Sequence, residues 1–464
     1  MLRVFRQYYP VRNILFVITE SVFIFLSIFT AIMLFDSERN PPPGMQFLYK
    51  ALIITVVCQL CIYYNDLYDM KSSLSPKEIW KQLFKALFIA NVVLGVMFFT
   101  IPWLSISPEI FFTGFILMLL MIGLIRLGYN LILERGYFNR RLMLIGESDL
   151  AREIADEIQL RADSGYKISC IVLDRANKDF MIDADTRVIQ KTDYSRLFEI
   201  AKEMGIKTIV VAIKEKRGNF PSEELLKCRI EGLKILDGDS FYEMLSGKLV
   251  VNQLYPSWLI FSDGFQKTLI RRIFKRTFDI VLSLLMTIVL MPLMLLVALI
   301  IKIDSKGPVF YSQDRVGQNH KNYKIYKFRS MIDNAEETNG PQFACENDPR
   351  ITRVGHFLRK LRIDEMPQLW NVLKGEMSFV GPRPERDVFV RDYEKEIPYY
   401  RERFSIKPGI TGWAQIRYQY GANTEETIEK LNYDLFYIKN MSILMDVMIV
   451  LRTIKIVLFG KGAR

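Results

Sequence analysis

Histidine and cysteine are scarce in this sequence. Its 464 residues include two histidines and five cysteines, an odd number without the spacing of a disulfide framework. Two histidines leave little room for a His-rich metal site, and the cysteine usage favours a reducing compartment over secretion. The phosphate-binding pattern GxxxxGK followed by Ser or Thr is absent. This absence excludes a P-loop NTPase.

Hydrophobic residues, by contrast, are abundant. They make up 50% of the chain, aromatic residues make up 13%, and the mean hydropathy is +0.13. This composition excludes a disordered or fibrous protein and argues against a wholly soluble one. The length predicts two or three domains. The formal net charge of +11 leaves three partner classes: nucleic acid, an anionic membrane surface or a phosphorylated substrate.

Four apolar segments predict a four-helix transmembrane bundle over residues 1–135. Three of them reach the length of about 20 residues that a spanning helix needs, and the second reaches it only with residues 47–49. Lysine and arginine gather on one side of the bundle, so the positive-inside rule places its ends and all that follows in the cytoplasm. Glu20 marks either a functional site or a hydrogen bond between helices. The segments are residues 13–35, 51–64, 84–104 and 110–132.

Residues 136–265 alternate between strand and helix patterns, which predicts a Rossmann-like parallel sheet. Only Gly146 keeps a fingerprint glycine in the first strand-to-helix turn, and Glu147 would repel a pyrophosphate there. Asp174 is a candidate for holding a ribose hydroxyl. We expect a degenerate or regulatory domain rather than an NAD-dependent enzyme. The expected strands are 142–145, 168–173 and 208–213, and the expected helices are 149–160 and 194–204.

A further apolar segment at about residues 275–303 is long enough to cross a membrane but has basic residues on both flanks. Pro292 lies near its middle. A helix broken at Pro292 that dips into the leaflet and returns satisfies both flanks at the cytoplasmic face. The alternative is a fifth span that is kinked at the proline. Residues 443–458 fit either an interfacial amphipathic helix or one packed in a core.

Asp364 and Glu365 stand in a region dense in glycine, proline and arginine. The apolar spacing after them predicts a helix that ends at Gly375, so the ordinary interpretation makes Asp364 its N-cap. That position also stabilises a carboxylate as the anion, through the helix dipole and the nearby Arg359 and Arg362. An ionised aspartate of this kind suits attack on phosphorus or binding of a divalent cation.

A group of cations accompanies this carboxylate pair. A phosphoryl substrate needs its oxygens neutralised, and the flanking prolines would fix the backbone of Arg383 for that purpose. Each cation alone is an ordinary surface residue, and their grouping is what favours a phosphate site. The candidates are Lys327, Arg329, Arg359 and Arg383.

From Arg271 onward the chain resembles the monotopic polyprenyl-phosphate sugar-1-phosphate transferases, the bacterial sugar transferase family. The preceding regions resemble its large-architecture branch, of the type associated with exopolysaccharide and exosortase gene clusters. The resemblance implies a mainly α-helical catalytic domain over residues 266–464, with a re-entrant helix at about 275–303. The motifs that carry it are Lys327-Phe-Arg-Ser-Met331, Leu361-Arg-Ile-Asp-Glu-Met-Pro-Gln-Leu-Trp-Asn-Val-Leu-Lys-Gly375, Gly381-Pro-Arg-Pro384 and Lys407-Pro-Gly-Ile-Thr-Gly-Trp-Ala-Gln415.

The resemblance also implies a mechanism. Asp364 would be the nucleophile that attacks the β-phosphate of a UDP-sugar and expels UMP, and Glu365 would be its partner in holding Mg²⁺. Arg359 and Arg383 fall on positions associated with phosphate and nucleotide binding. Undecaprenyl phosphate would then accept the sugar phosphate at the inner membrane of a bacterium. A homodimer is a candidate assembly.

Two other functions stay open. One is a metal-dependent glycosyltransferase that uses Asp183-Ala-Asp185 or Asp237-Gly-Asp239 and releases UDP. The other is a membrane sensor without enzymatic activity, whose Rossmann-like domain binds a nucleotide. The sugar is also open, because Ile416-Arg-Tyr418 stands where many family members have Asn-Gly-Arg. Nucleic acid is excluded, since residues 271–330 hold eleven Lys or Arg against three Asp around a membrane segment and no nucleic-acid motif occurs.

Overall fold

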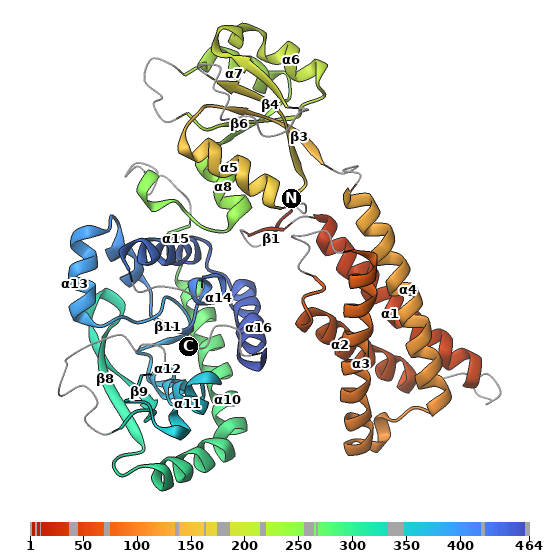
Figure 1. Ribbon diagram of the computed structural model, residues 1–464, viewed down its shortest axis with the longest axis vertical. Helices are drawn as coiled ribbons and strands as arrows, with labels where there is room; N and C mark the ends of the chain where they lie inside the picture. The colour runs from red at the N-terminus through yellow and green to blue at the C-terminus, as the bar shows by residue number, and fades with distance from the viewer. Residues whose placement is uncertain are drawn as a thin grey trace. The chain divides into compact units, whose positions relative to one another are not determined.

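The fold is mostly helical and forms two compact units, Met1–Ser246 and Gly247–Arg464 (Figure 1). The predicted bundle lies within the first unit, and the second unit begins before the predicted boundary at residue 266. The computed structural model describes residues 2–4, 7–9, 11–36, 45–68, 75–134, 139–161, 164–173, 186–213, 220–254, 264–265, 268–332, 348–418 and 423–459.

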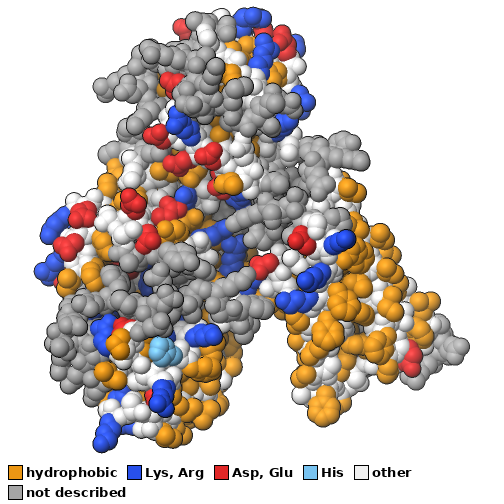
Figure 2. All heavy atoms as spheres, in the orientation of Figure 1, with side chains coloured by type: hydrophobic (Ala, Val, Ile, Leu, Met, Phe, Trp, Pro, Cys, Tyr) orange, Lys and Arg blue, Asp and Glu red, His pale blue; other side chains and the backbone are white. Residues whose placement is uncertain are grey.

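Four long helices occupy the predicted apolar segments of the first unit, which confirms those helices. α1 packs against α2 and α4, and α3 packs against α2 and α4, around a core of buried isoleucine, leucine and alanine. Hydrophobic side chains also cover their outer surfaces (Figure 2). Each helix is long and apolar enough to cross a membrane. The helices are α1 (Val11–Asp36), α2 (Met45–Tyr64), α3 (Pro76–Thr100) and α4 (Pro108–Glu134), after a short hairpin of β1 (Leu2–Val4) and β2 (Gln7–Tyr9).

Glu20 of α1 forms a buried ion pair with Arg126 of α4. The Arg126 Nη2 atom lies 2.7 Å from the Glu20 Oε1 atom, and its Nη1 donates to the Leu67 carbonyl oxygen at 2.7 Å. The rings of Phe16 and Tyr68 also face the guanidinium. The sequence left two interpretations of Glu20, a functional site or a bond between helices, and the structure shows the bond between helices. A buried charge of this kind needs a partner of opposite sign.

Replacing Arg126 with leucine is expected to lower the free energy of unfolding by about 3 kcal/mol, because Glu20 would stay buried without its cation. Replacing both residues with leucine should recover most of this loss, since an apolar pair of similar volume needs no charge compensation. Thermal unfolding in nanodiscs measures both variants. Equal stability of wild type and Arg126→Leu would contradict the assignment, and so would a double variant less stable than the single one.

The rest of the first unit is a parallel five-stranded sheet with strand order β5-β4-β3-β6-β7, which confirms the predicted sheet. The two edge strands were not predicted, because each is four residues long and holds only two apolar residues between polar ends. The elements are β3 (Arg140–Ile145), α5 (Asp149–Leu160), β4 (Tyr166–Leu173), β5 (Arg187–Gln190), η4 (Lys191–Arg196), α6 (Leu197–Glu203), β6 (Thr208–Val211), α7 (Ser222–Ile230), β7 (Lys234–Asp237) and α8 (Gly238–Ser246).

The first strand-to-helix turn of this sheet is filled by its own residues. Gly146 has φ +121°, and a Cβ atom there would lie 2.4 Å from the Ala212 carbonyl oxygen. The Ser148 hydroxyl donates to that same oxygen at 2.6 Å and accepts from the Ala151 amide, which caps α5. An amide group that would face a phosphate is thus already bound by Ser148.

The second unit combines the long helix α10 and several shorter helices with two small sheets. β8 (Phe310–Val316) and β9 (Asn322–Phe328) form an antiparallel hairpin, and β10 (Ser378–Val380) pairs in parallel with β11 (Gly409–Thr411). The helices are η5 (Val251–Gln253), α10 (Leu269–Asp304), η6 (Gln318–His320), α11 (Arg353–Lys360), η7 (Ile363–Glu365), α12 (Gln368–Lys374), α13 (Asp387–Glu396), η8 (Tyr400–Ser405), α14 (Trp413–Arg417), α15 (Thr424–Asn440) and α16 (Ile443–Phe459).

α10 is one 36-residue helix with Pro292 inside it, so the predicted break is not an interruption of the helix. Proline has no N–H to donate to the carbonyl four residues earlier, which weakens the helix there. Figure 1 shows α10 changing direction along its length. Its first half buries Asp279 and Ser283, and its second half buries Val297 and Ile301. The stretch around Pro292 exposes apolar side chains: Leu284, Leu285, Ile288, Val289 and Met291.

Both halves of α10 pack against other elements of the second unit. In the first half, Lys275 donates to Asp446 of α16 at 2.9 Å and to the Val380 carbonyl oxygen at 3.1 Å. In the second half, Val297 and Ile301 join a cluster with Phe328 and residues of α11 and η7. One face of α16 is packed in the core and buries Met445, Asp446 and Ile449. The helix also exposes apolar side chains: Ile443, Leu444, Val447 and Ile454.

Candidate active site

Asp364 and Glu365 lie in a single 3₁₀ turn, η7, between α11 and α12. The turn begins at Arg362, whose φ of 54° is left-handed and therefore strained for a residue with a side chain. Ile363 packs in an apolar cluster with Leu358. With this backbone the two acidic side chains are buried, and Asp364 and Glu365 are only 7% and 8% exposed.

The expected N-cap role of Asp364 is wrong. α12 begins at Gln368, after Pro367. The backbone before Pro367 is bonded in the 3₁₀ pattern, from residue i to residue i−3, as in the bond from the Met366 amide to the Ile363 carbonyl oxygen. The predicted stop is confirmed, since α12 ends at Lys374 and Gly375 follows with φ 90°.

Glu365 binds two cations through one oxygen. The Lys327 Nζ atom donates to its Oε1 at 3.0 Å, and the Arg383 Nη2 atom donates to the same Oε1 at 2.7 Å. Lys327 belongs to β9, and Arg383 follows β10. Three segments far apart in the sequence therefore meet at this carboxylate.

Asp364 has a different environment. No hydrogen bond or ion pair reaches its side chain from the part of the chain that the structure describes. Burial and the charge of Glu365 raise the pKa of Asp364 to about 6, against the opposing effect of Lys327, Arg359 and Arg383. The sequence predicted a strongly stabilised anion, and the raised pKa corrects this because burial outweighs the neighbouring cations.

Glu365 shifts the opposite way. Burial acts to raise its pKa, but Arg383 and Lys327 outweigh burial and hold the pKa of Glu365 below its usual range. The pair therefore consists of one carboxylate neutralised by two ion pairs and one whose oxygens no donor among the described residues engages. A carboxylate whose lone pairs are not engaged by donors has the chemistry that a nucleophile needs.

The two carboxylates open onto a pocket of about 280 Å³. Six lysine or arginine residues and four acidic residues line it, so it offers mainly positive charge to a ligand. The lining residues are Lys327, Arg359, Arg362, Asp364, Glu365, Arg383, Glu385, Arg403, Ala414, Gln415, Tyr418, Lys430 and Asp434.

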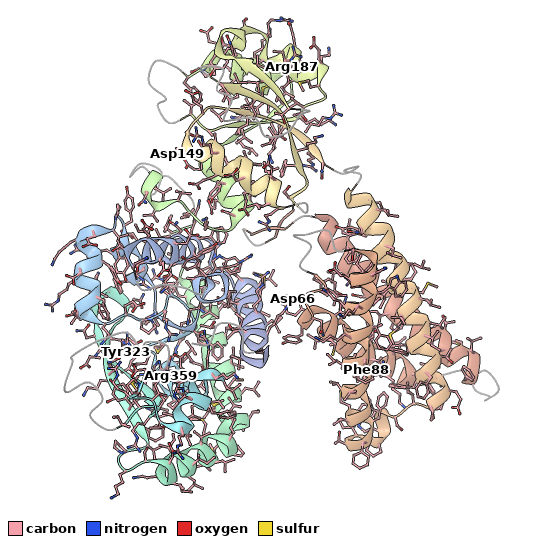
Figure 3. The ribbon with its side chains drawn as sticks, in the orientation of Figure 1. Asp66, Phe88, Asp149, Arg187, Tyr323 and Arg359 are labelled. Carbon is pink, nitrogen blue, oxygen red and sulfur yellow. The ribbon has the colours of Figure 1, made fainter. Side chains whose placement is uncertain are left out.

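Five of the predicted site residues thus meet in one place: Asp364, Glu365, Lys327, Arg359 and Arg383. Figure 3 shows Arg359 within the second unit, on α11. Arg329 does not line the pocket. Its Nη2 atom donates instead to the carbonyl and hydroxyl oxygens of Ser305, both at 2.8 Å, at the end of α10.

Other lining residues were not predicted from the sequence. Ala414 and Gln415 belong to the motif Lys407–Gln415 but were not assigned to the site, and Lys430 and Asp434 are spaced by four residues on α15. That spacing places two polar side chains on one helix face, which was the available signal. Arg403 carried no signal, since it is one of several arginines in its segment.

Magnesium fits this site in part. The described residues contain no group of three or more His, Cys, Asp or Glu that could hold a metal. Asp364 and Glu365 would supply two carboxylates, and Mg²⁺ commonly takes one or two of these together with water and substrate phosphates. The raised pKa of Asp364 indicates a buried charge for which a cation would compensate.

The other candidate acidic motifs do not contribute to the pocket. Asp174, Asp183 and Asp185 lie outside the described residues. Asp237 ends β7 and Asp239 lies in α8, both in the first unit. Neither lines the pocket.

The region that forms the pocket also matches known proteins. A family model described as bacterial sugar transferase matches residues 270–460, which include every residue of the pocket. The exopolysaccharide production protein PSS of Rhizobium leguminosarum bv. phaseoli is 44% identical over 188 residues, which cover 39% of this chain and 94% of that protein. The chain belongs to the bacterial sugar transferase family.

Two further relatives of this family are longer than the region they share with the chain. The UDP-N-acetylgalactosamine-undecaprenyl-phosphate N-acetylgalactosaminephosphotransferase of Aeromonas hydrophila is 42% identical over 240 residues, 52% of this chain and 56% of that protein. The undecaprenyl-phosphate glucose phosphotransferase of Komagataeibacter xylinus is 41% identical over 194 residues, 41% of this chain and 36% of that protein. The chain thus spans about half or less of these two relatives.

Proposed function

We propose that this bacterial sugar transferase moves a sugar 1-phosphate from a UDP-sugar to undecaprenyl phosphate, releases UMP and passes through a phosphosugar-aspartate at Asp364. One observation carries the proposal: the buried Asp364 carboxylate, which no hydrogen bond or ion pair from the described residues engages, lines a pocket together with six lysine or arginine residues. The names of the relatives support the acceptor and the class of donor. We further propose that the product initiates assembly of an exopolysaccharide or a related glycan.

The first step forms a bond between an Asp364 oxygen and the β-phosphorus of the donor. The bond from that phosphorus to the oxygen bridging the α-phosphate breaks, and UMP leaves with the electron pair. Arg383 and Lys327 can neutralise the phosphoryl oxygens, since both already converge on Glu365. Bound Mg²⁺, held by Asp364 and Glu365, would supply further charge neutralisation to the diphosphate.

The second step transfers the phosphosugar to the lipid. A phosphate oxygen of undecaprenyl phosphate attacks the same phosphorus, the bond to Asp364 breaks, and the carboxylate is restored. The acceptor needs no deprotonation when it arrives as the dianion, so Glu365 can serve as the ion-pair partner that keeps Lys327 and Arg383 in place.

We propose that residues 1–135 form a transmembrane bundle, that residues 136–265 form a degenerate Rossmann-like domain, and that residues 266–464 form the catalytic domain on the cytoplasmic face of the inner membrane. Within the last domain we propose that α10 enters the membrane and returns. A straight helix of 36 residues would be about 54 Å long. The bend, the exposed apolar stretch around Pro292 and the packing of both halves against one unit support this geometry.

Cysteine accessibility tests the path of α10. A single cysteine introduced at Lys306 is expected to react with a membrane-impermeant maleimide only from the cytoplasmic side, as is one at Arg271. Replacing Pro292 with leucine should favour a straight helix and shift part of the Lys306→Cys population to periplasmic labelling. Periplasmic labelling of Lys306→Cys in the presence of Pro292 would contradict the re-entrant path.

The rate of the first step is expected to fall as pH drops through about 6, because a protonated Asp364 has no charge with which to attack. Bound Mg²⁺ should move this inflection to lower pH, since a cation favours the carboxylate form. Rapid-quench measurements of UMP formation between pH 5 and 8 at two Mg²⁺ concentrations test both points. A rate that rises as the pH falls would contradict the assignment.

Nucleotide release tests the whole reaction. The full chain in nanodiscs is supplied with Mg²⁺, undecaprenyl phosphate and a panel of UDP-glucose, UDP-galactose and UDP-N-acetylgalactosamine. We expect turnover that yields UMP, and only UMP, with one of these donors. Release of UDP would favour a glycosyltransferase instead, and no release with any donor would favour a sensor.

A further inference from the structure

The loop that carries Arg383 is held through its backbone. The carbonyl oxygens of Val380, Pro382, Arg383, Pro384 and Glu385 each accept a hydrogen bond from another part of the second unit. The loop also lies very close to the turn at Gly409, where a Cβ atom would stand 2.0 Å from the Gly381 nitrogen. The donors are Lys275, the Gly409 amide, Arg403, Arg315 and the Val316 amide.

Arg403 is the donor at the centre of this arrangement. Its Nη2 atom donates to the Arg383 carbonyl oxygen at 3.0 Å and to Asp434 Oδ2 at 3.1 Å. Its Nη1 atom donates to the Tyr400 hydroxyl. Arg403 is 7% exposed and Asp434 is 3% exposed, so the ion pair is buried.

Stability alone does not account for a buried ion pair of this kind, since apolar residues of the same volume often stabilise a fold equally well. Burial raises the pKa of Asp434 to about 6, and the Arg403 guanidinium opposes this shift because it favours the ionised carboxylate. A planar guanidinium can contact a carboxylate, a hydroxyl and a carbonyl at once, which a lysine ammonium on its flexible stem does with less geometric control. The carbonyl it contacts belongs to the residue that binds Glu365.

We propose that Arg403, held by Asp434 and Tyr400, is a positioning residue for Arg383. It fixes the backbone from which the Arg383 side chain reaches Glu365 and the phosphoryl group. Asp434 on α15 thereby becomes part of the support of the active site. This inference rests on the proposed function, because it concerns the rate of the same phosphoryl transfer.

Single-turnover kinetics test the proposal, with UMP release measured by rapid quench in the full chain without acceptor. The burst amplitude counts competent sites, and the rate constant reports their geometry. We expect Arg403→Met to keep most of the amplitude and to lower the rate constant about 30-fold, within the range that misplacement of a catalytic group produces. Arg403→Lys should recover part of the rate. A reduced amplitude with an unchanged rate constant would overturn the proposal and leave a folding role alone.

A double-variant cycle separates positioning from direct contact with the substrate, because Arg403 also lines the pocket. If Arg403 acts through Arg383, the pair Arg383→Ala and Arg403→Met should be no slower than Arg383→Ala alone. Effects that multiply would overturn the proposal and indicate a contact of Arg403 with the donor.

Arg401 provides the matched control. It lies in the same 3₁₀ segment, its side chain is 75% exposed, and it pairs with Glu394 at 3.5 Å. Arg401→Met should keep both the amplitude and the rate constant, and a 30-fold loss there would overturn the specific role of Arg403. Asp434→Asn should slow the burst less than Arg403→Met, because the amide oxygen still accepts a hydrogen bond. Absence of a burst in the wild type would instead refute the proposed function itself.

Discussion

Replacing Asp364 with asparagine is expected to reduce UMP release by a factor on the order of 10⁴, as removal of a covalent nucleophile does in other enzymes. Asparagine keeps the size of the side chain, so the buried turn should still form. Its amide cannot attack phosphorus, and no neighbouring group replaces it, because Glu365 is engaged by Lys327 and Arg383. The measurement is the rate of UMP formation with and without undecaprenyl phosphate.

Asp387 serves as the matched control for this variant. It is an aspartate of the same unit, its side chain is 42% exposed, and it pairs with Arg391 on the surface of α13. Asp387→Asn should release UMP at the rate of the wild type. Turnover by Asp364→Asn within tenfold of the wild type would rule out a nucleophilic role for Asp364.

Replacing Arg383 with alanine is expected to lower the rate of the first step by about 10³-fold, comparable to the loss of a key charge-stabilising donor. Arg383 donates to Glu365 at 2.7 Å and also faces the pocket, so the variant loses a cation for the phosphoryl group. It also leaves the buried Glu365 with Lys327 as its contact, which raises the pKa of Glu365 toward its ordinary value.

The first-step rate of Arg383→Lys should lie between those of the wild type and Arg383→Ala. An ammonium keeps the charge but cannot contact Glu365 and a phosphate through a planar fork. The exposed Arg391 of α13 gives the control, and Arg391→Ala should retain the wild-type rate. The rate constant and KM of each variant separate transition-state stabilisation from binding. An Arg383→Ala variant that raises KM alone would limit Arg383 to ground-state binding of the donor.

Hydropathy predicted the long helices and the central strands well, because each of them is a continuous apolar segment of the sequence. α2 and α4 follow from apolar runs, and β3 and β6 follow from short apolar strands between polar turns. The edge strand β5 was missed, since an exposed edge needs no apolar pattern. The course of α10 was harder to predict. Pro292 indicated a change of direction, but the sequence did not show that the helix continues through the proline.

The site was predictable where motifs carried it and obscure where tertiary contacts made it. Asp364 and Arg383 are 19 residues apart and belong to recognisable motifs, whereas Arg403 and Asp434 meet only through packing of η8 against α15. Arg329 is only two residues from Lys327, but β9 ends between them at Phe328. The Arg329 side chain therefore contacts Ser305 and not the pocket. The raised pKa of Asp364 also depends on burial, which the sequence around it did not reveal.

The most direct test of the central claim is the mass of the peptide that contains Asp364 after the full chain is incubated with a UDP-sugar and Mg²⁺, without lipid acceptor, and quenched in acid. We predict a mass increase of one phosphosugar on Asp364, formed in equal amount to UMP, absent from Asp364→Asn and lost when undecaprenyl phosphate is added. UMP formation that requires the lipid and leaves Asp364 unmodified at every time point would contradict the covalent mechanism.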